Sequence, residues 1–305
     1  MGNEELGRHY QKIGELSKAF EAFSRMRQDA VAAQHIVECS KHVISVAIEQ
    51  ENWPAVSSNV QKIQGVQQHP EQEKWIQPYL KTALGLAHLD NRDYEAACRS
   101  FLNTDAGMGY NCNTFISPND VATYGGICAL ASMDRNQLQM DVLENSNFRT
   151  YLELEPHIRR AISFFVNSRY SACLEILESH RPDYLLDIYL QKHVEDLYQM
   201  IRTKSIVQYF IPFSCVTLDS LNIAFAAPGT TIDKELSKMI ENGELKGRID
   251  TQNKVSSCAA TYDVKTNAFF SFSLPFLLPH AQPYTAALST QPRSTNERLN
   301  EEFST

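Results

Sequence analysis

Apolar side chains recur at the spacing of an α-helix through most of the first 210 residues. Ile36, Val43 and Ala47 share one face of a predicted helix, and a similar face begins at Val121 and Tyr124. Apolar residues three or four positions apart line one side of a helix, whereas a strand alternates with a period of two. The pattern therefore predicts a mainly α-helical chain.

One part of this pattern occurs twice in the first half of the chain. The matching positions are Leu6, Gly7, Tyr10, Ala19 and Phe23 in the first copy, and Leu84, Gly85, His88, Ala97 and Phe101 in the second. Small residues let two antiparallel helices touch, and large aromatic residues fill the groove between neighbouring helix pairs. We therefore assign a repeat-packing role to Leu6, Gly7, Tyr10, Ala19, Phe23, Leu84, Gly85, Ala97 and Phe101.

The order L-G-x-x-Y followed by A-x-x-x-F resembles the core of the tetratricopeptide (TPR) helix pair, although both copies lack its leading Trp. Chance matching among common small and aromatic residues is the alternative. The helical spacing between the copies favours true repeats. We expect TPR-like helical repeats over residues 1–115, and the resemblance implies that they wind as a right-handed superhelix.

The segment S-P-N-D at residues 117–120 predicts the start of another helix. Ser117 suits the N-cap, Pro118 suits the first helical position, and Asp120 follows at the third. Gly125 and Gly126 then lie inside the helix, where a glycine costs about 1 kcal/mol relative to alanine. Close packing against a neighbouring helix explains them better than a phosphate-binding loop, because they come after the helix start.

Residues 212–262 have a different pattern. Residues 217–227 read as a short helix, and a second helix follows Thr230 or Thr231, either of which can cap it, and stops at Gly243. Residues 245–250 alternate as a strand does, residues 251–254 form a turn, and a second strand begins near Val255. Helices followed by a β-hairpin predict a winged helix. Its expected core is Leu221, Phe225, Ile232, Leu236 and Ile240.

Charge argues against nucleic acid as the partner of this hairpin. The chain has 305 residues and a net charge of −8, and residues 232–255 carry five basic and five acidic side chains. Phosphate contacts dominate nucleic-acid affinity, and a neutral segment on an acidic chain supplies few of them. A membrane partner is not expected either. The apolar run at residues 268–278 is shorter than the roughly 20 residues of a membrane helix, and Pro275 interrupts it.

No constellation of residues points to catalysis. The seven cysteines include no C-x-x-C pair, which favours a reducing compartment over a disulfide framework or a zinc site. His35 and His42 share a helical face, but a surface or packing role explains them better than metal binding, because no carboxylate or Cys partner is evident in the sequence. Glu153 and Glu155 precede Pro156, where acidic groups favour a helix start. We therefore expect no enzymatic activity, no metal and no cofactor.

Helical repeats that lead into a winged helix are the layout of PCI-domain proteins. This family supplies scaffold subunits to the proteasome lid, the COP9 signalosome and a translation-initiation complex. The stretches SPNDVATYGGICALASMDRNQL (117–138), YLELEPHIRRAI (151–162), LLDIYLQKHVEDLYQMIRTKSIVQYFIPF (185–213) and LNIAFAAPGTTIDKELSKMIENGELKGRID (221–250) look most like its signalosome branch. The resemblance covers most of residues 4–255. It implies a PCI domain over residues 116–262, with a helical part at 116–211 and the winged helix at 212–262.

The resemblance also implies a function. The chain would be a non-catalytic scaffold subunit of a complex that removes the ubiquitin-like modifier Nedd8 from cullins, with the metalloprotease centre in another subunit. Its direct partners would be other PCI-domain subunits, cullin-RING ligases would be indirect partners, and its location would be the cytoplasm and nucleus. By the same analogy, neighbouring subunits join edge to edge along a strand made of Leu245, Lys246, Gly247, Arg248, Ile249 and Asp250.

Two alternatives and two departures from the family pattern remain. The chain could be a scaffold of the proteasome lid or of the initiation complex, which co-purifying partners would reveal, or a winged-helix nucleic-acid binder, which a basic groove would favour. The first departure is that the chain begins inside a repeat at Glu4, whereas the family usually has further N-terminal helices. The second departure concerns residues 263–305. Where the family continues into a long helix, this segment is broken by prolines and rich in Ser and Thr, which predicts a disordered tail.

Overall fold

The computed structural model describes residues 2–28, 32–67, 70–105, 115–213, 215–226, 230–250, 255–258, 261–263 and 268–270. The fold is mainly helical, as the periodicity predicted. Its helices up to residue 210 are α1 (Gly2–Lys12), α2 (Leu16–Gln28), α3 (Ala33–Glu49), α4 (Trp53–Gln64), α5 (Pro70–Asp90), α6 (Tyr94–Leu102), α7 (Pro118–Ser132), α8 (Arg135–Gln137), the π-helix η2 (Leu138–Leu143), α9 (Ser146–Leu152), α10 (Pro156–Val166), α11 (Tyr170–Leu185) and α12 (Val194–Phe210).

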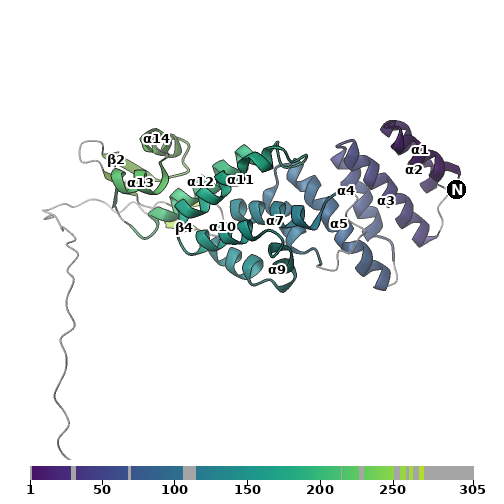
Figure 1. The fold of residues 1–305 in the computed structure, drawn as a ribbon, viewed down its shortest axis with the longest axis horizontal. Coiled ribbons are helices and arrows are strands. Elements are labelled where there is room, and N and C mark those ends of the chain that lie inside the picture. The colour runs from purple at the N-terminus through teal and green to yellow at the C-terminus, as the bar shows by residue number, and fades with distance from the viewer. Residues whose placement is uncertain are drawn as a thin grey trace, which may run out of the picture. The chain divides into compact units, whose positions relative to one another are not determined.

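From α1 to α7 each helix packs against the next one along the chain. Helices α2 to α5 can be followed in this order in Figure 1. Helix α7 also packs against α9, α10 and α12, and ten of its fifteen residues are buried. A helix that is apolar on all sides belongs in a core, so α7 connects the N-terminal helices to those that follow. No helix in the described ranges is long and apolar enough to cross a bilayer.

The two sequence copies make the same helix-to-helix contact. A methyl group built on Gly7 would lie 2.6 Å from Cε1 of Phe23, and one built on Gly85 would lie 2.6 Å from Cε1 of Phe101. A contact this short leaves no room for a Cβ atom. Both phenylalanine rings are fully buried, so in each copy a large ring on the second helix packs on a glycine of the first.

The small and aromatic residues of the repeats differ in burial. Ala19 and Ala97 are 0% exposed, and Tyr10 is half-buried. Leu84 is partly buried against the core, but Leu6 is 42% exposed. The packing role expected for Leu6 is therefore wrong. Helix α5 packs between α4 and α6, whereas α1 packs mainly on α2, which leaves one side of α1 to solvent.

Helix α7 begins as the sequence predicted. The hydroxyl of Ser117 accepts a hydrogen bond from the Asp120 N–H, and the Asp120 carboxylate accepts one from the Ser117 N–H, which forms a capping box. A methyl group on Gly125 would lie 2.9 Å from Cζ of Phe148, and one on Gly126 would overlap Cγ2 of Ile158. The prediction that these glycines allow close helix packing is confirmed.

The last described part of the chain contains two helices and two small sheets. These elements are β1 (Cys215–Thr217), α13 (Leu218–Phe225), α14 (Asp233–Glu241), β2 (Gly247–Asp250), β3 (Val255–Cys258), β4 (Thr261–Asp263) and β5 (Ala268–Phe270). Strands β1, β3 and β2 form an antiparallel sheet in that order. Ser257 of the central strand β3 lies opposite Cys215 of β1 on one side and opposite Arg248 of β2 on the other. The turn predicted at residues 251–254 lies outside the described residues.

The ends of α14 test two predictions. Gly243 follows the helix with a φ of +76°, a conformation that favours glycine, so the predicted stop is confirmed. The predicted threonine cap is wrong. Ile232 occupies the N-cap without a side-chain cap, and its N–H donates to Oδ1 of Asn222 at 2.9 Å. The Asn222 side chain thus links α13 to the N-cap residue of α14.

The predicted boundary at residue 262 falls inside a hairpin. Strand β4 pairs with β5 in an antiparallel register that places Tyr262 opposite Phe269. The structure describes a short strand at Ala268–Phe270, and the disordered tail expected over residues 263–305 stays a prediction. Aromatic residues favour a pleated strand, and this short segment has two of them. The other residues of the predicted tail, 264–267 and 271–305, lie outside the described residues.

Candidate protein interface

Strand β2 lies at an edge of the three-stranded sheet. It pairs with β3 on one side, and no other described strand pairs with it. An edge strand presents a row of backbone N–H and C=O groups that can pair with a strand of another chain. This edge is the candidate interface.

The edge is shorter than the sequence predicted. Leu245 and Lys246 precede β2, and Leu245 is 1% exposed, so it cannot belong to an accessible edge. The reason is the turn after α14, where the N–H groups of Glu244 and Leu245 both donate to the backbone oxygen of Met239. This turn directs the Leu245 side chain into the core. The strand itself contains Gly247, Arg248, Ile249 and Asp250.

Side chains of the strand alternate as a half-buried strand requires. Arg248 is exposed, and Ile249 is partly buried against the core. Exposure of Arg248 places a charged residue on the outer face, which is a common feature of edge strands. The backbone N–H and C=O groups alternate as well. Those of Gly247 and Ile249 point toward one neighbouring-strand side of β2, and those of Arg248 and Asp250 point toward the opposite side.

The core beneath the sheet comes from α13, α14 and the residue before α14. Leu221 and Leu236 are 0% exposed, Ile232 is 1% exposed and Phe225 is 5% exposed. Ile240 is only partly buried at the margin of this core. Burial of these side chains holds α13 and α14 against each other and thereby fixes the platform on which β2 lies.

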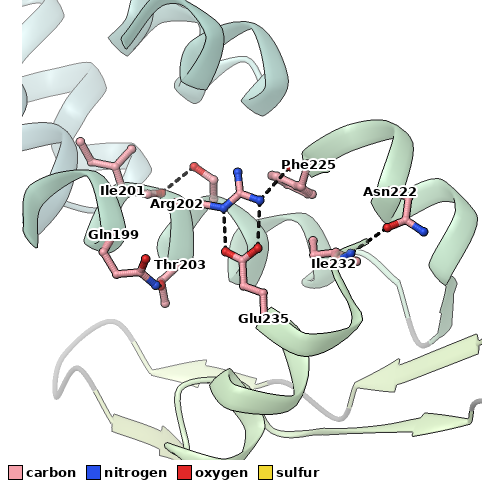
Figure 2. Close-up of polar contacts among 9 residues, drawn as sticks. Gln199, Ile201, Arg202, Thr203, Asn222, Phe225, Ile232 and Glu235 are labelled. Atoms are coloured by element: carbon pink, nitrogen blue, oxygen red, sulfur yellow. Dashed lines mark hydrogen bonds and ion pairs between the residues drawn. The ribbon is translucent and has the colours of Figure 1, made fainter. Parts of the chain in front are cut away.

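An ion pair joins this platform to α12. Figure 2 shows the guanidinium of Arg202 facing the carboxylate of Glu235 on α14, with Nε 2.6 Å from Oε1 and Nη2 2.9 Å from Oε2. The same Nη2 donates to the backbone oxygen of Phe225 at the end of α13, at 2.7 Å. A two-pronged contact of this kind restricts both distance and angle. Arg202 therefore sets how α13 and α14 sit on α12.

The sequence contained no signal for this contact. Arg202 and Glu235 lie 33 positions apart on different helices, so no helical spacing relates them. Arg202 therefore received no role from the sequence alone.

A double-mutant cycle should measure the contribution of this contact. Because both side chains are about 70% buried, we expect Arg202→Ala and Glu235→Ala to show a coupling free energy of about 1–2 kcal/mol. The control is the exposed pair Arg149–Glu153, whose atoms are 3.7 Å apart, with an expected coupling below about 0.5 kcal/mol. Chemical denaturation of the four variants in each cycle gives both values. Equal coupling in the two cycles would contradict a positioning role for Arg202.

The exposed charges of α14 are mixed. Lys234 and Lys238 are exposed, as is Glu241, and Glu235 is already paired with Arg202. A helix that reads a DNA groove needs cations to meet phosphates, and two lysines beside an exposed glutamate supply few. The described surface of α14 is better suited to a protein than to a nucleic acid.

Metal-binding side chains do not cluster in the described ranges. No group of three or more His, Cys, Asp or Glu residues there could hold a metal ion. His42 stacks on the Phe23 ring, with the ring centres 4.9 Å apart, and burial lowers the pKa of its imidazole. The stacking supports the expected packing role of His42, although the structure does bring a carboxylate near it, with Oε1 of Glu4 3.9 Å from Nε2.

Comparison with known proteins places two domains on the chain. Residues 1–141 match the family described as 26S proteasome subunit RPN7, and residues 177–256 match the PCI domain. The first match extends through α7, and the second includes α12, α14 and β2.

The chain is also similar to curated proteins. The chain is 49% identical to COP9 signalosome complex subunit 1 of Emericella nidulans over 84% of its own length and 53% of that relative. It is 48% identical to the Neurospora crassa protein of the same name over 83% of its length and 60% of the relative. Similarity to 26S proteasome non-ATPase regulatory subunit 6 of Oryza sativa is lower, at 22% over 79% of the chain. The chain thus spans about half to three fifths of the curated signalosome relatives.

Proposed function

Because the chain belongs to the PCI-domain family and its curated homologues are COP9 signalosome complex subunit 1, we propose that it is a non-catalytic scaffold subunit of the signalosome. The observation that carries this proposal is the edge strand β2, held by a buried core and by the Arg202–Glu235 contact. A rigid strand edge is suited to joining subunits. The chain uses backbone groups at this edge to bind neighbouring PCI-domain subunits.

The proposal includes two features of the fold. The N-terminal helices form a TPR-like right-handed superhelix, which the repeated glycine-to-phenylalanine contacts at Gly7 and Gly85 support. Helices α13 and α14 with the sheet β1-β3-β2 form a winged helix, which their order and the buried position of Leu236 support. In this arrangement the winged helix forms the interface with neighbouring subunits, and the repeats extend away from that interface.

The chain supports cullin deneddylation through assembly and needs no cofactor. Cullin-RING ligases are its indirect partners, and it acts in the cytoplasm and nucleus. The second candidate is a scaffold role in the proteasome lid. Identity to the lid subunit of Oryza sativa is 22%, against 49% to the signalosome subunit of Emericella nidulans, which favours the signalosome.

Proline substitution in β2 tests the edge contact. Proline removes one backbone donor and fixes φ. Gly247 and Arg248 face opposite sides of the strand, so Gly247→Pro and Arg248→Pro each remove a different N–H. We expect the variant that loses the outward N–H to bind other PCI subunits about tenfold more weakly while its melting temperature stays nearly unchanged. The other variant should lose stability, because its N–H pairs with β3.

Affinity purification of tagged full-length variants, followed by mass spectrometry of the bound subunits, measures assembly. Arg248→Ala is the control, since it removes the side chain but keeps the N–H, and it should assemble normally. Recovery of proteasome-lid subunits in place of signalosome subunits would support the second candidate. Normal assembly by a folded variant lacking the outward N–H would refute the edge contact.

Tight binding of duplex DNA at physiological salt, lost on mutation of Lys234 and Lys238, would refute the scaffold role of α14.

A further inference from the structure

An open groove of about 810 Å³ lies where α11, α12 and α13 meet. Leu174 and Glu175 of α11, Tyr198 of α12 and Ile223 of α13 are among the residues that form its walls. A cleft of this volume can take several side chains of a bound molecule. None of the described residues that line the groove belongs to β2, so the groove is separate from the proposed strand edge.

The wall that α13 contributes is apolar. Ile223 is 87% exposed, whereas Leu218 and Leu221 of the same helix are buried in the core. Ala224 and Phe225 continue the wall beside Ile223, and Figure 2 shows Phe225 where the end of α13 meets α12. A single exposed aliphatic side chain is common on protein surfaces. The charges around Ile223 therefore decide which partner would cover it.

The charged side chains of the groove are mainly acidic. Its three carboxylates belong to Glu175, Glu178 and Glu195. Its two cations are Arg181 and Arg202, and Arg202 is already paired with Glu235, which is outside the lining. With Glu235 included, four carboxylates accompany two guanidinium groups, which leaves an excess of two negative charges.

The groove already holds one guanidinium group, that of Arg181. Nη1 donates to Oε1 of Glu178 at 3.0 Å, and Nη2 donates to Oε1 of Glu195 on α12. The same group lies over the Tyr198 ring, with Cζ 5.7 Å from the ring centre. Carboxylates from two helices beside an aromatic face are a favourable environment for a cation. Glu175 is exposed and has no ion-pair partner within the described ranges, so a second cation could pair with it.

We propose that this groove is the docking site for a basic peptide segment of another protein, in which at least two Arg or Lys residues accompany one large apolar residue. A cation of the segment pairs with Glu175, and the apolar side chain packs on Ile223. Charge complementarity selects such a segment, because the excess of carboxylates repels nucleic acid, anionic lipid headgroups and acidic peptides. The site is additional to the strand edge and does not depend on the proposed assembly.

Two exposed side chains allow a test that leaves the core intact. Glu175→Gln removes the unpaired charge, and Ile223→Ser removes the exposed apolar group. The matched control makes the same two exchanges outside the groove, as Glu153→Gln and Ile188→Ser, where the side chains are 57% and 70% exposed. Because all four side chains are exposed, both double variants should melt within about 2 °C of the unaltered chain.

The probe is a phage-displayed library of random twelve-residue peptides, selected on the full-length chain at physiological salt. We expect the enriched peptides to contain at least two Arg or Lys residues beside a Leu, Ile, Met or Phe residue. Synthetic copies, measured by fluorescence anisotropy, should bind the Glu175→Gln/Ile223→Ser variant at least tenfold more weakly than the unaltered chain. The control variant should bind them as tightly as the unaltered chain does.

Three results would overturn the proposal. The first is enrichment of no peptides, or of acidic or uncharged ones. The second is binding of the enriched basic peptides to the groove variant within threefold of the unaltered chain, since this would place their site elsewhere. The third is an equal loss of affinity in the groove variant and the control variant, which would show that exposed charge and apolar surface act without regard to position.

Discussion

Replacing Leu236 by aspartate is expected to lower the free energy of unfolding by about 4 kcal/mol. Leu236 is 0% exposed and, with Met239, is one of the two buried residues of α14. The substitution removes apolar contacts and places a carboxylate among them without a partner. Thermal or urea denaturation of the full-length chain, followed by circular dichroism, would show the change as a lower midpoint.

Ser237→Asp is the matched control, because it introduces the same charge on the next residue of the same helix. Ser237 is exposed, so the change in unfolding free energy should stay within about 0.5 kcal/mol. Similar unfolding midpoints for the Leu236→Asp and Ser237→Asp variants would mean that the Leu236 side chain does not face the core. If only the Leu236 variant loses stability, we expect that variant also to assemble less well with other subunits, because the strand edge β2 rests on α14.

Replacing Phe101 by alanine is expected to have a similar effect in the repeats, at about 3–5 kcal/mol. The ring is fully buried, contacts Gly85, and meets the Tyr124 ring with the ring centres 5.9 Å apart in an edge-on arrangement. Its removal leaves a cavity where α5, α6 and α7 meet. Gly85 on α5 has no side chain that could fill this cavity. Calorimetry of the full-length protein gives the change in melting temperature.

Phe213→Ala deletes the same side chain at an exposed position. Phe213 is 48% exposed, so we expect a loss below about 1 kcal/mol. Phe23→Ala tests the first copy of the repeat, where the ring packs on Gly7 in the same way, and it should also be clearly destabilising. A tolerated Phe101→Ala variant would show that the glycine-to-phenylalanine contact does not support the stack.

The sequence alone determined the features that depend on neighbours along the chain. The capping box of Ser117 and Asp120 and the stop at Gly243 need only a few consecutive residues. The repeated spacing indicated that Gly7 and Gly85 lie where helices touch, whereas the direct contact of each glycine with a phenylalanine of its own helix pair came from the structure. Local hydrogen bonds, backbone preferences and helical periodicity act over one or two turns, and a sequence displays them directly.

The tertiary structure decided the features that join distant segments. Cys215–Thr217 becomes a strand because β3, about forty positions later, offers an edge to pair with. Arg202 finds Glu235 across 33 positions, and Arg181 finds Glu195 across 14. Leu245 leaves the predicted edge because the turn after α14 directs it inward. Such contacts depend on which surfaces the packed helices bring together, and burial then decides whether a charged group needs a partner, as at Arg202, or can face solvent, as at Glu175.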